Sequence, residues 1–164
     1  DVRRRRVRLL RDVVRAPRAS RIAIVAHDAL AGLPYPDVFD LVLVDAPCSG
    51  LGILRRDPDT KWRRREADVE AFATRQSTML GHAARVVARG GRLVYATCSS
   101  EPEENEEVAR GFLASHSGFR PAAPAAAWEA PPLRELLAAS GALEILPERH
   151  GLDAFYAVAW ERLR

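Results

Sequence analysis

The chain has 164 residues, 48% of them hydrophobic and 29% charged, which is the size and balance of one globular domain with a hydrophobic core. No apolar run approaches the roughly 18 residues that cross a bilayer, and the N-terminal arginine run does not resemble a signal peptide, so we expect a cytoplasmic protein. The formal net charge is +3, and Lys61 is the sole lysine. Because the planar guanidinium of arginine suits phosphate, RNA or a nucleotide is the expected partner.

The hydrophobic pattern predicts helices that alternate with short aliphatic strands. In chain order, the expected elements are a helix from about 3 to 15, strands at 22–26 and 41–44, a helix from about 66 to 88 ended by Gly90 and Gly91, a strand at 92–97, a helix from 102 to about 115, and late strands at 142–147 and 154–160. Residues 118–132, rich in alanine and proline, are expected to form a surface loop. Aliphatic strands of this kind indicate a parallel sheet covered on both faces, and the whole pattern predicts a Rossmann-like α/β sheet.

The predicted domain begins part-way through this pattern. A Rossmann-like domain opens with a strand, a glycine-rich turn and a helix, and none of these precedes Asp1. We therefore expect residues 1–164 to form a single, N-terminally truncated domain without the first strand and the glycine-rich loop.

Reactive side chains follow the predicted strands, where ligands bind in sheets of this type. They are Asp1, Asp28, Asp45, Cys48 and Cys98. We expect these two thiols and three carboxylates to meet at one rim of the sheet. Each also has a structural alternative, because cysteines after buried strands are commonly inert packed residues and most such aspartates cap helices or turns. Two cysteines are too few for a disulfide framework and lack the spacing of zinc ligands, so no metal is expected.

Three segments of the chain have motif-like sequences. Residues 43–52 (LVDAPCSGLG) continue through 55–62 (RRDPDTKW), residues 95–99 (YATCS) are followed by EENE at 103–106, and residues 150–157 read HGLDAFYA. The first two resemble the fourth and sixth motifs of the Sun (RsmB)-type RNA cytosine-C5 methyltransferases. The third resembles their closing motif, although Ala154 replaces its final glycine and a leucine separates Gly151 from Asp153. Either cysteine motif alone is moderate evidence, whereas both in this order are specific.

The resemblance implies S-adenosyl-L-methionine-dependent methylation of a cytosine C5 in RNA, with ribosomal RNA as the expected substrate. Cytosine C5 is a poor nucleophile, and addition of a thiolate at C6 activates it. By resemblance, Cys98 forms this covalent adduct, Cys48 assists its breakdown, and Asp45 contacts the cytosine edge and the methionine end of the cofactor. DNA cytosine methyltransferases use the Pro-Cys cysteine instead, so the two roles depend on the resemblance and the sequence itself does not rank the thiols.

The same resemblance places further residues at the cofactor and the RNA. Asp28 matches the position that contacts the adenine, and Asp1 the residue that holds the ribose hydroxyls. Arg56, Lys61 and Trp62 lie in a basic and aromatic segment that is expected to bind phosphate and stack on a single-stranded or flipped-out base; the alternative is a solvated loop with Trp62 in the core. We expect a monomer, and weak binding of S-adenosyl-L-methionine by the chain alone because the glycine-rich loop is absent.

Two other functions remain open at this point. The chain could be a non-catalytic RNA-binding remnant that keeps the fold without a methyl-donor site. It could also be a thiol-redox protein, which would form a reversible disulfide between Cys48 and Cys98, whereas methyl transfer needs both thiols free.

Overall fold

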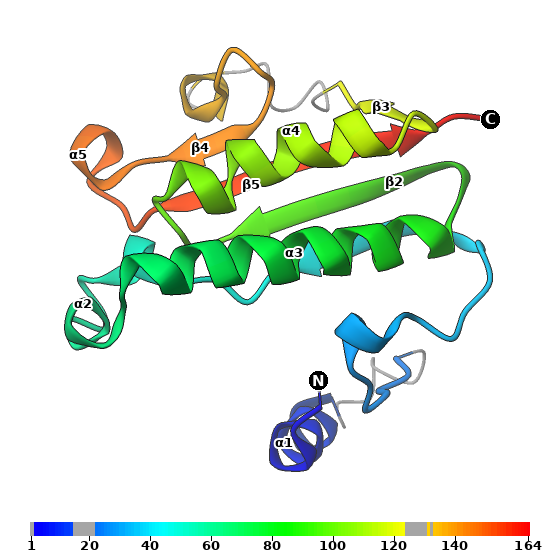
Figure 1. The fold of residues 1–164 in the computed structure, drawn as a ribbon, viewed down its shortest axis with the longest axis horizontal. Helices are drawn as coiled ribbons and strands as arrows, with labels where there is room; N and C mark the ends of the chain where they lie inside the picture. Colours follow the sequence, from blue (N-terminus) through cyan, green and yellow to red (C-terminus); the bar gives the residue numbers. More distant parts are fainter. Residues whose placement is uncertain (1, 15–21, 124–130, 132) are drawn as a thin grey trace.

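A computed structural model describes residues 2–14, 22–123, 131 and 133–164. It contains a mixed α/β sheet with two long helices lying across one face (Figure 1). The helices are α1 (Arg4–Val14), α2 (Thr60–Arg63), α3 (Glu66–Val86), α4 (Glu106–Ser115) and α5 (Pro147–His150), and the strands are β1 (Phe39–Asp45), β2 (Val87–Thr97), β3 (Phe119–Pro121), β4 (Leu143–Ile145) and β5 (Phe155–Arg162). Short 3₁₀ helices are η1 (Ala29–Ala31), η2 (Leu51–Ile53), η3 (Pro102–Glu104) and η5 (Leu133–Leu136). The predicted Rossmann-like α/β class is confirmed.

The sheet contains one parallel pair and a late strand, β5, that pairs antiparallel with three other strands. Strands β1 and β2 pair in parallel, joined through α3, with Asp45 opposite Ala96 at their carboxyl ends. Strand β5 runs antiparallel to β2, and β3 and β4 pair with β5. Because parallel strands end at the same edge, the segments that follow β1 and β2 leave the sheet side by side.

The core lies between the sheet and the pair of helices α3 and α4. Trp160 of β5 is 1% exposed, and its ring packs against Phe112 of α4 and Tyr95 of β2 at centroid distances of 4.4 and 6.5 Å. Leu80 of α3 and Leu93 of β2 are fully buried in the same cluster. Helices α3 and α4 therefore each bury one face, as the helical spacing of their apolar residues indicates.

The opposite face of β1 differs from the expectation. Val42 and Val44 lie in or against the core, while Leu41 and Leu43, which alternate with them, are each 62% exposed. The expectation that helices cover both faces of the sheet was therefore wrong for β1, within the described part of the chain. Residues 22–26 were also wrongly expected to be a strand, since 22–28 contain no regular structure. A strand needs a partner for its backbone groups, and β1, the edge of the described sheet, pairs with β2 alone.

The glycine pair after α3 has a different role from the one expected. Helix α3 already ends at Val86, and β2 begins at Val87, before Gly90 and Gly91. The glycines lie in an irregularity of the β1–β2 pairing. A Cβ at Gly91 would lie 2.9 Å from the Phe39 carbonyl oxygen, so glycine permits the close approach of the two strands.

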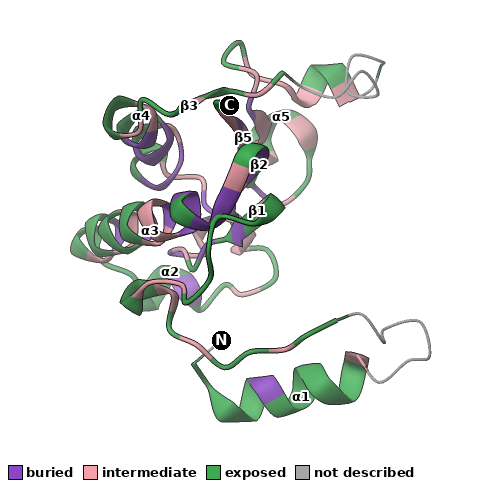
Figure 2. Cartoon of the chain, turned by 90° about the vertical axis from the view of Figure 1, so that its right-hand side faces the viewer, coloured by how far each residue is buried: buried purple, intermediate pink, exposed green. Residues whose placement is uncertain are grey.

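Two smaller features complete the fold. Helix α1 lies apart from the sheet and is exposed except for Val7 and the half-buried Val14 (Figure 2). The expected surface loop at 118–132 contains β3, a short edge strand on β5, and residues 124–130 and 132 lie outside the described part. No helix among the described residues is long and apolar enough to cross a membrane.

Truncation of Trp160 is expected to destabilise the chain. Trp160→Ala removes a fully packed ring between α4 and β2, which costs about 3–5 kcal/mol of unfolding free energy. Urea denaturation followed by far-ultraviolet circular dichroism measures this loss. Trp62→Ala is the matched control, because Trp62 is 83% exposed, and it should change the stability by less than about 0.5 kcal/mol. Equal losses in the two variants would contradict this description of the core.

Candidate active site

The two cysteines meet at the carboxyl ends of the parallel strands. Cys48 follows β1 and Cys98 follows β2, both are half-buried free thiols, and their sulfurs are 3.0 Å apart. This distance is that of a thiol–thiol hydrogen bond and exceeds the roughly 2.05 Å of a disulfide. The expected convergence of the two thiols at one rim is confirmed.

The contact between the sulfurs makes the two thiols chemically different. A hydrogen bond from Cys48 lowers the pKa of Cys98 to about 7, although burial of Cys98 works in the opposite direction. The hydrogen bond with Cys98, and then burial, raise the pKa of Cys48 well above its usual range. The pair therefore shares one proton near neutral pH, with the thiolate on Cys98 and the proton on Cys48. The two opposite shifts belong to the thiols as one pair.

Asp45 lies at the same rim. It is the last residue of β1, it is exposed, and its negative charge is close enough to Cys98 to oppose ionisation of that thiol. An exposed carboxylate at this rim is available to accept a hydrogen bond from a ring bound near the thiols.

The structure does not bring Asp28 to the thiols. Asp28 caps η1, and its Oδ1 accepts a hydrogen bond from the Leu30 backbone N–H at 3.0 Å. The next residue, Ala29, contacts His82 of α3 at 2.8 Å. His82 lies about one and a half turns further along α3 than Gln76, which reaches the cysteine loop. Of the alternatives considered for Asp28, the cap is the one observed, and Asp1 lies outside the described residues.

A glycine links the three motifs. The Gly52 N–H donates to the Cys98 carbonyl at 3.1 Å, and the Gly52 carbonyl accepts from the Ala154 N–H at 2.9 Å. A Cβ at position 52 would lie 2.5 Å from the Cys98 carbonyl oxygen. The loop that contains Cys48 is thus fixed against the loop that contains Cys98, and against the closing motif at Ala154.

A buried carboxylate, which the sequence analysis quoted only within a motif, joins the same two loops. Glu104 Oε2 accepts hydrogen bonds from the hydroxyls of Ser49 at 2.5 Å and Ser99 at 2.6 Å. Its Oε1 accepts from the Ser49 backbone N–H and from Gln76 Nε2, both at 2.9 Å. We call Ser49, Gln76, Ser99 and Glu104 the Glu104 cluster. The available signal in the sequence was the serine directly after each cysteine.

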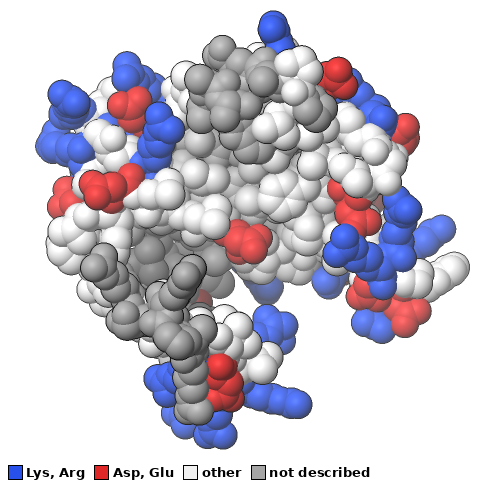
Figure 3. Space-filling view, turned by 180° about the vertical axis from the view of Figure 1, so that it is seen from behind, with Lys and Arg blue, Asp and Glu red and all other residues white. Residues whose placement is uncertain are grey.

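The predicted RNA-contacting residues are solvated. Trp62 of α2 is 83% exposed, so the alternative that placed it in the core was wrong. The Lys61 ammonium lies 5.7 Å from the centroid of the Trp62 ring. Arg56 pairs with Asp153 of the closing motif at 2.5 Å, and its side chain is 80% exposed. Figure 3 shows basic side chains gathered at the periphery of one face, around a mainly uncharged centre.

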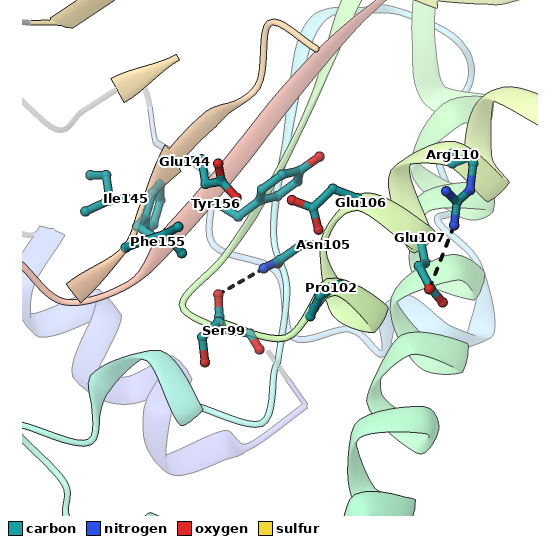
Figure 4. A pocket seen from close by; sticks show the side chains of 12 residues that line it. Ser99, Pro102, Asn105, Glu106, Glu107, Arg110, Glu144, Ile145, Phe155 and Tyr156 are labelled. Carbon is teal, nitrogen blue, oxygen red and sulfur yellow. Dashed lines mark hydrogen bonds and ion pairs between the residues drawn. The ribbon is translucent and has the colours of Figure 1, made fainter. Parts of the chain in front are cut away.

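A cavity of about 270 Å³ lies beside the Cys98 loop. Asn105, Glu106, Glu144 and Tyr156 line it, and Asn105 Nδ2 donates to the Ser99 carbonyl at 3.0 Å (Figure 4). Burial, and then the nearby Glu144 carboxylate, raise the pKa of Glu106. The two cysteines do not line this cavity. Among the residues that the structure describes, no group of three His, Cys, Asp or Glu side chains is placed to hold a metal ion.

Comparison with known proteins identifies the family. A family model described as 16S rRNA methyltransferase RsmB/F matches residues 1–161. The chain belongs to this family. Ribosomal RNA small subunit methyltransferase B of Sodalis glossinidius is 51% identical over 79 residues, covering 48% of this chain and 18% of that protein. The crystal structure of PH0851 superposes with a TM-score of 0.81 at 32% identity, covering 99% of this chain and 36% of that one.

A second solved structure agrees in fold. A methyltransferase homolog protein from Pyrococcus horikoshii superposes with a TM-score of 0.76 at 27% identity, covering 99% of this chain and 52% of that one. The chain spans about a quarter of the length of the curated relatives that it matches. This chain therefore has the fold of the corresponding part of an RsmB/F methyltransferase.

The shared proton predicts how the thiols react with an alkylating agent. Only a thiolate attacks iodoacetamide, so labelling of Cys98 should rise about tenfold per pH unit below a midpoint near 7 and level off above it, while Cys48 stays unlabelled. Cys48→Ala removes the hydrogen-bond donor, so the Cys98 midpoint should move up toward roughly 8.5. Peptide mass spectrometry of samples quenched at each pH separates the two sites, and Cys98→Ala is the control. Labelling of Cys48 before Cys98 would reverse the assignment.

Proposed function

We propose that this RsmB/F family chain methylates cytosine C5 in RNA, with ribosomal RNA as the substrate class and Cys98 as the nucleophile. The observation that supports this most directly is the pair of free sulfurs 3.0 Å apart at the strand ends, with Asp45 beside them. A lone reactive cysteine would suit many reactions. Two cysteines that divide one proton suit a reaction in which a thiolate both adds to a ring and later leaves it. We propose that this reaction takes place in the cytoplasm and that the protein acts as a monomer.

The chain's own groups account for the thiol steps. The Cys98 thiolate adds to cytosine C6, and the electron pair of the C5–C6 double bond moves toward C5 and the rest of the ring. Asp45, at the rim beside Cys98, accepts a hydrogen bond from the ring edge and fixes its orientation. After methylation, a base takes the C5 proton, the electron pair of the C5–H bond re-forms the C5–C6 double bond, and the C6–S bond breaks so that its electron pair leaves on the Cys98 sulfur. Cys48 then donates a hydrogen bond to the departing thiolate, which favours release.

S-adenosyl-L-methionine is the proposed methyl donor and supplies an electrophilic methyl group when bound. Asp45 fits a role near its methionine end, because this carboxylate is exposed at the rim where the thiols lie. Asp28 is also exposed and remains a candidate for contact with the adenine. Asp1 remains a candidate for the ribose hydroxyls.

Covalent trapping tests the proposed reaction. The full-length gene product should form a denaturation-resistant complex with target RNA containing 5-azacytidine in the presence of S-adenosyl-L-methionine, because the ring then cannot complete elimination. Cys98→Ala should abolish the complex. Cys48→Ala should instead accumulate adduct on unmodified RNA, because the donor that assists release is lost. Denaturing gel electrophoresis with labelled RNA measures both, and a folded protein that binds RNA but forms no adduct would favour the non-catalytic remnant.

The α2 segment should contribute to RNA affinity. Trp62→Ala removes an exposed ring on which a base can stack, so binding should weaken about 5- to 100-fold. Lys61→Ala should weaken binding less and reduce its dependence on salt. Filter binding at several salt concentrations checks both variants. Arg110→Ala, which removes an exposed arginine from α4, is the matched control, and an equal loss with this variant would argue against α2 as the contact site.

A further inference from the structure

The two cysteine loops are built in the same way around Glu104. Each cysteine is followed by a buried serine, and both serine hydroxyls donate to the same carboxylate oxygen. Each hydroxyl also accepts from a backbone N–H two residues further on, Leu51 for Ser49 at 3.4 Å and Glu101 for Ser99 at 3.1 Å. The carboxylate therefore binds the turn after Cys48 to the turn after Cys98.

Glu104 itself is held from several sides. It is fully buried at the end of η3, and the Tyr95 hydroxyl donates to its backbone carbonyl at 2.6 Å. Gln76 of α3 donates both to Glu104 Oε1 and to the Pro47 carbonyl, at 2.9 and 3.1 Å. The two acceptors of Nε2 set the orientation of this amide, and its Oε1 is buried without a hydrogen-bond partner among the described residues.

Neighbouring contacts fix the Cys98 loop to η3 as well. Asn105 Nδ2 donates to the Ser99 carbonyl (Figure 4). The Thr97 hydroxyl donates to Asn105 Oδ1 at 2.5 Å. A buried carboxylate is costly unless several donors satisfy it, and four donors do so here. Since those donors come from both cysteine loops and from α3, this side chain joins the loops through their side chains, in addition to the backbone link at Gly52.

We propose that Glu104 is a positioning residue of the two-thiol site: its buried carboxylate joins Ser49 to Ser99 and so sets the distance between the Cys48 and Cys98 sulfurs. The sulfurs are 3.0 Å apart, and the hydrogen bond between them weakens as the loops separate. The consequence for catalysis rests on the proposed function, whereas the consequence for the thiols does not.

A reagent that needs both thiols at once measures their separation. Phenylarsine oxide condenses with two thiols, so that two As–S bonds form, the two thiol protons leave with the arsenic-bound oxygen as water, and nothing is oxidised. Glu104→Gln keeps the shape of the side chain but replaces one acceptor oxygen with an NH2 group, which then faces either the two serine hydroxyls or the Ser49 N–H and the Gln76 amide and cannot accept from them. We expect it to weaken binding of phenylarsine oxide about tenfold, because the two sulfurs no longer act as one chelating site. Glu103→Gln, an exposed neighbour with the same change of charge, should have no effect.

The pH profile separates positioning from a general loss of structure. Glu104→Gln should raise the midpoint of Cys98 alkylation because the donor on Cys48 moves away, although removal of the Glu104 charge, which opposes ionisation of Cys98, acts in the opposite direction. In a Cys48→Ala background, which already lacks the donor, Glu104→Gln should not raise the midpoint, and loss of the charge alone should lower it. Circular dichroism shows whether each variant is folded. An unchanged midpoint and unchanged arsenical affinity in folded Glu104→Gln overturn the proposal.

Two additions keep the test decisive. If Glu104→Gln does not fold, Ser99→Ala removes one arm of the cluster, and unchanged thiol measurements in folded Ser99→Ala overturn the proposal in the same way. In the full-length gene product, Glu104→Gln should lower kcat for RNA methylation about 100-fold with little change in KM. Thiol measurements need neither RNA nor methyl donor, so altered thiols without any adduct on azacytidine RNA would support Glu104 and reject the proposed function.

Discussion

The hydrogen bond between the sulfurs of Cys48 and Cys98 is the interaction on which the chemistry of this structure depends. It exists because β1 and β2 are parallel neighbours and therefore end at one edge of the sheet. It makes one thiol acidic at the expense of the other, so that a single proton distinguishes two otherwise similar residues. The sheet brings the two loops close together, but the end of a strand fixes the position of the following loop only approximately. Contacts outside the sheet therefore set the distance between the two sulfurs.

Those contacts are polar and buried, which is an unusual way to fix two loops. An apolar contact tolerates sliding, whereas a carboxylate with four short hydrogen bonds defines both distance and direction. Gly52 adds a backbone link from the Cys48 loop to the Cys98 carbonyl, at a separation that no side chain would permit. The site is thus held by Glu104 in the interior and by the close backbone approach at Gly52, and the sulfurs lie between them, half-exposed to a substrate.

The parts of the fold that could be predicted from the sequence are those with local signals. The aliphatic runs of β1, β2 and β5 and the apolar spacing of α3 are visible along the chain, and their packing around Trp160 follows from burial. Residues 22–26 look equally aliphatic, yet they form no strand because strand formation depends on a neighbour that local sequence does not show. The glycines at 90 and 91 suggested a helix stop, but their role depends on the approach of Phe39 from another strand. The pairing of Cys48 with Cys98 was predictable from topology, while the convergence of Ser49 and Ser99 on Glu104 required coordinates.

The asymmetry of the thiol pair also explains why two cysteines serve the proposed reaction better than one. Attack on a ring needs a thiolate at neutral pH, whereas release needs that same sulfur to be a good leaving group, and both conditions favour a low pKa at Cys98. Desolvation in a half-buried site works against this. A donor at hydrogen-bond distance offsets the desolvation without a second positive charge, which would compete for the phosphates of RNA. Cys48, kept protonated by its own raised pKa, is such a donor, and it stays in place through both steps because its loop is fixed to that of Cys98.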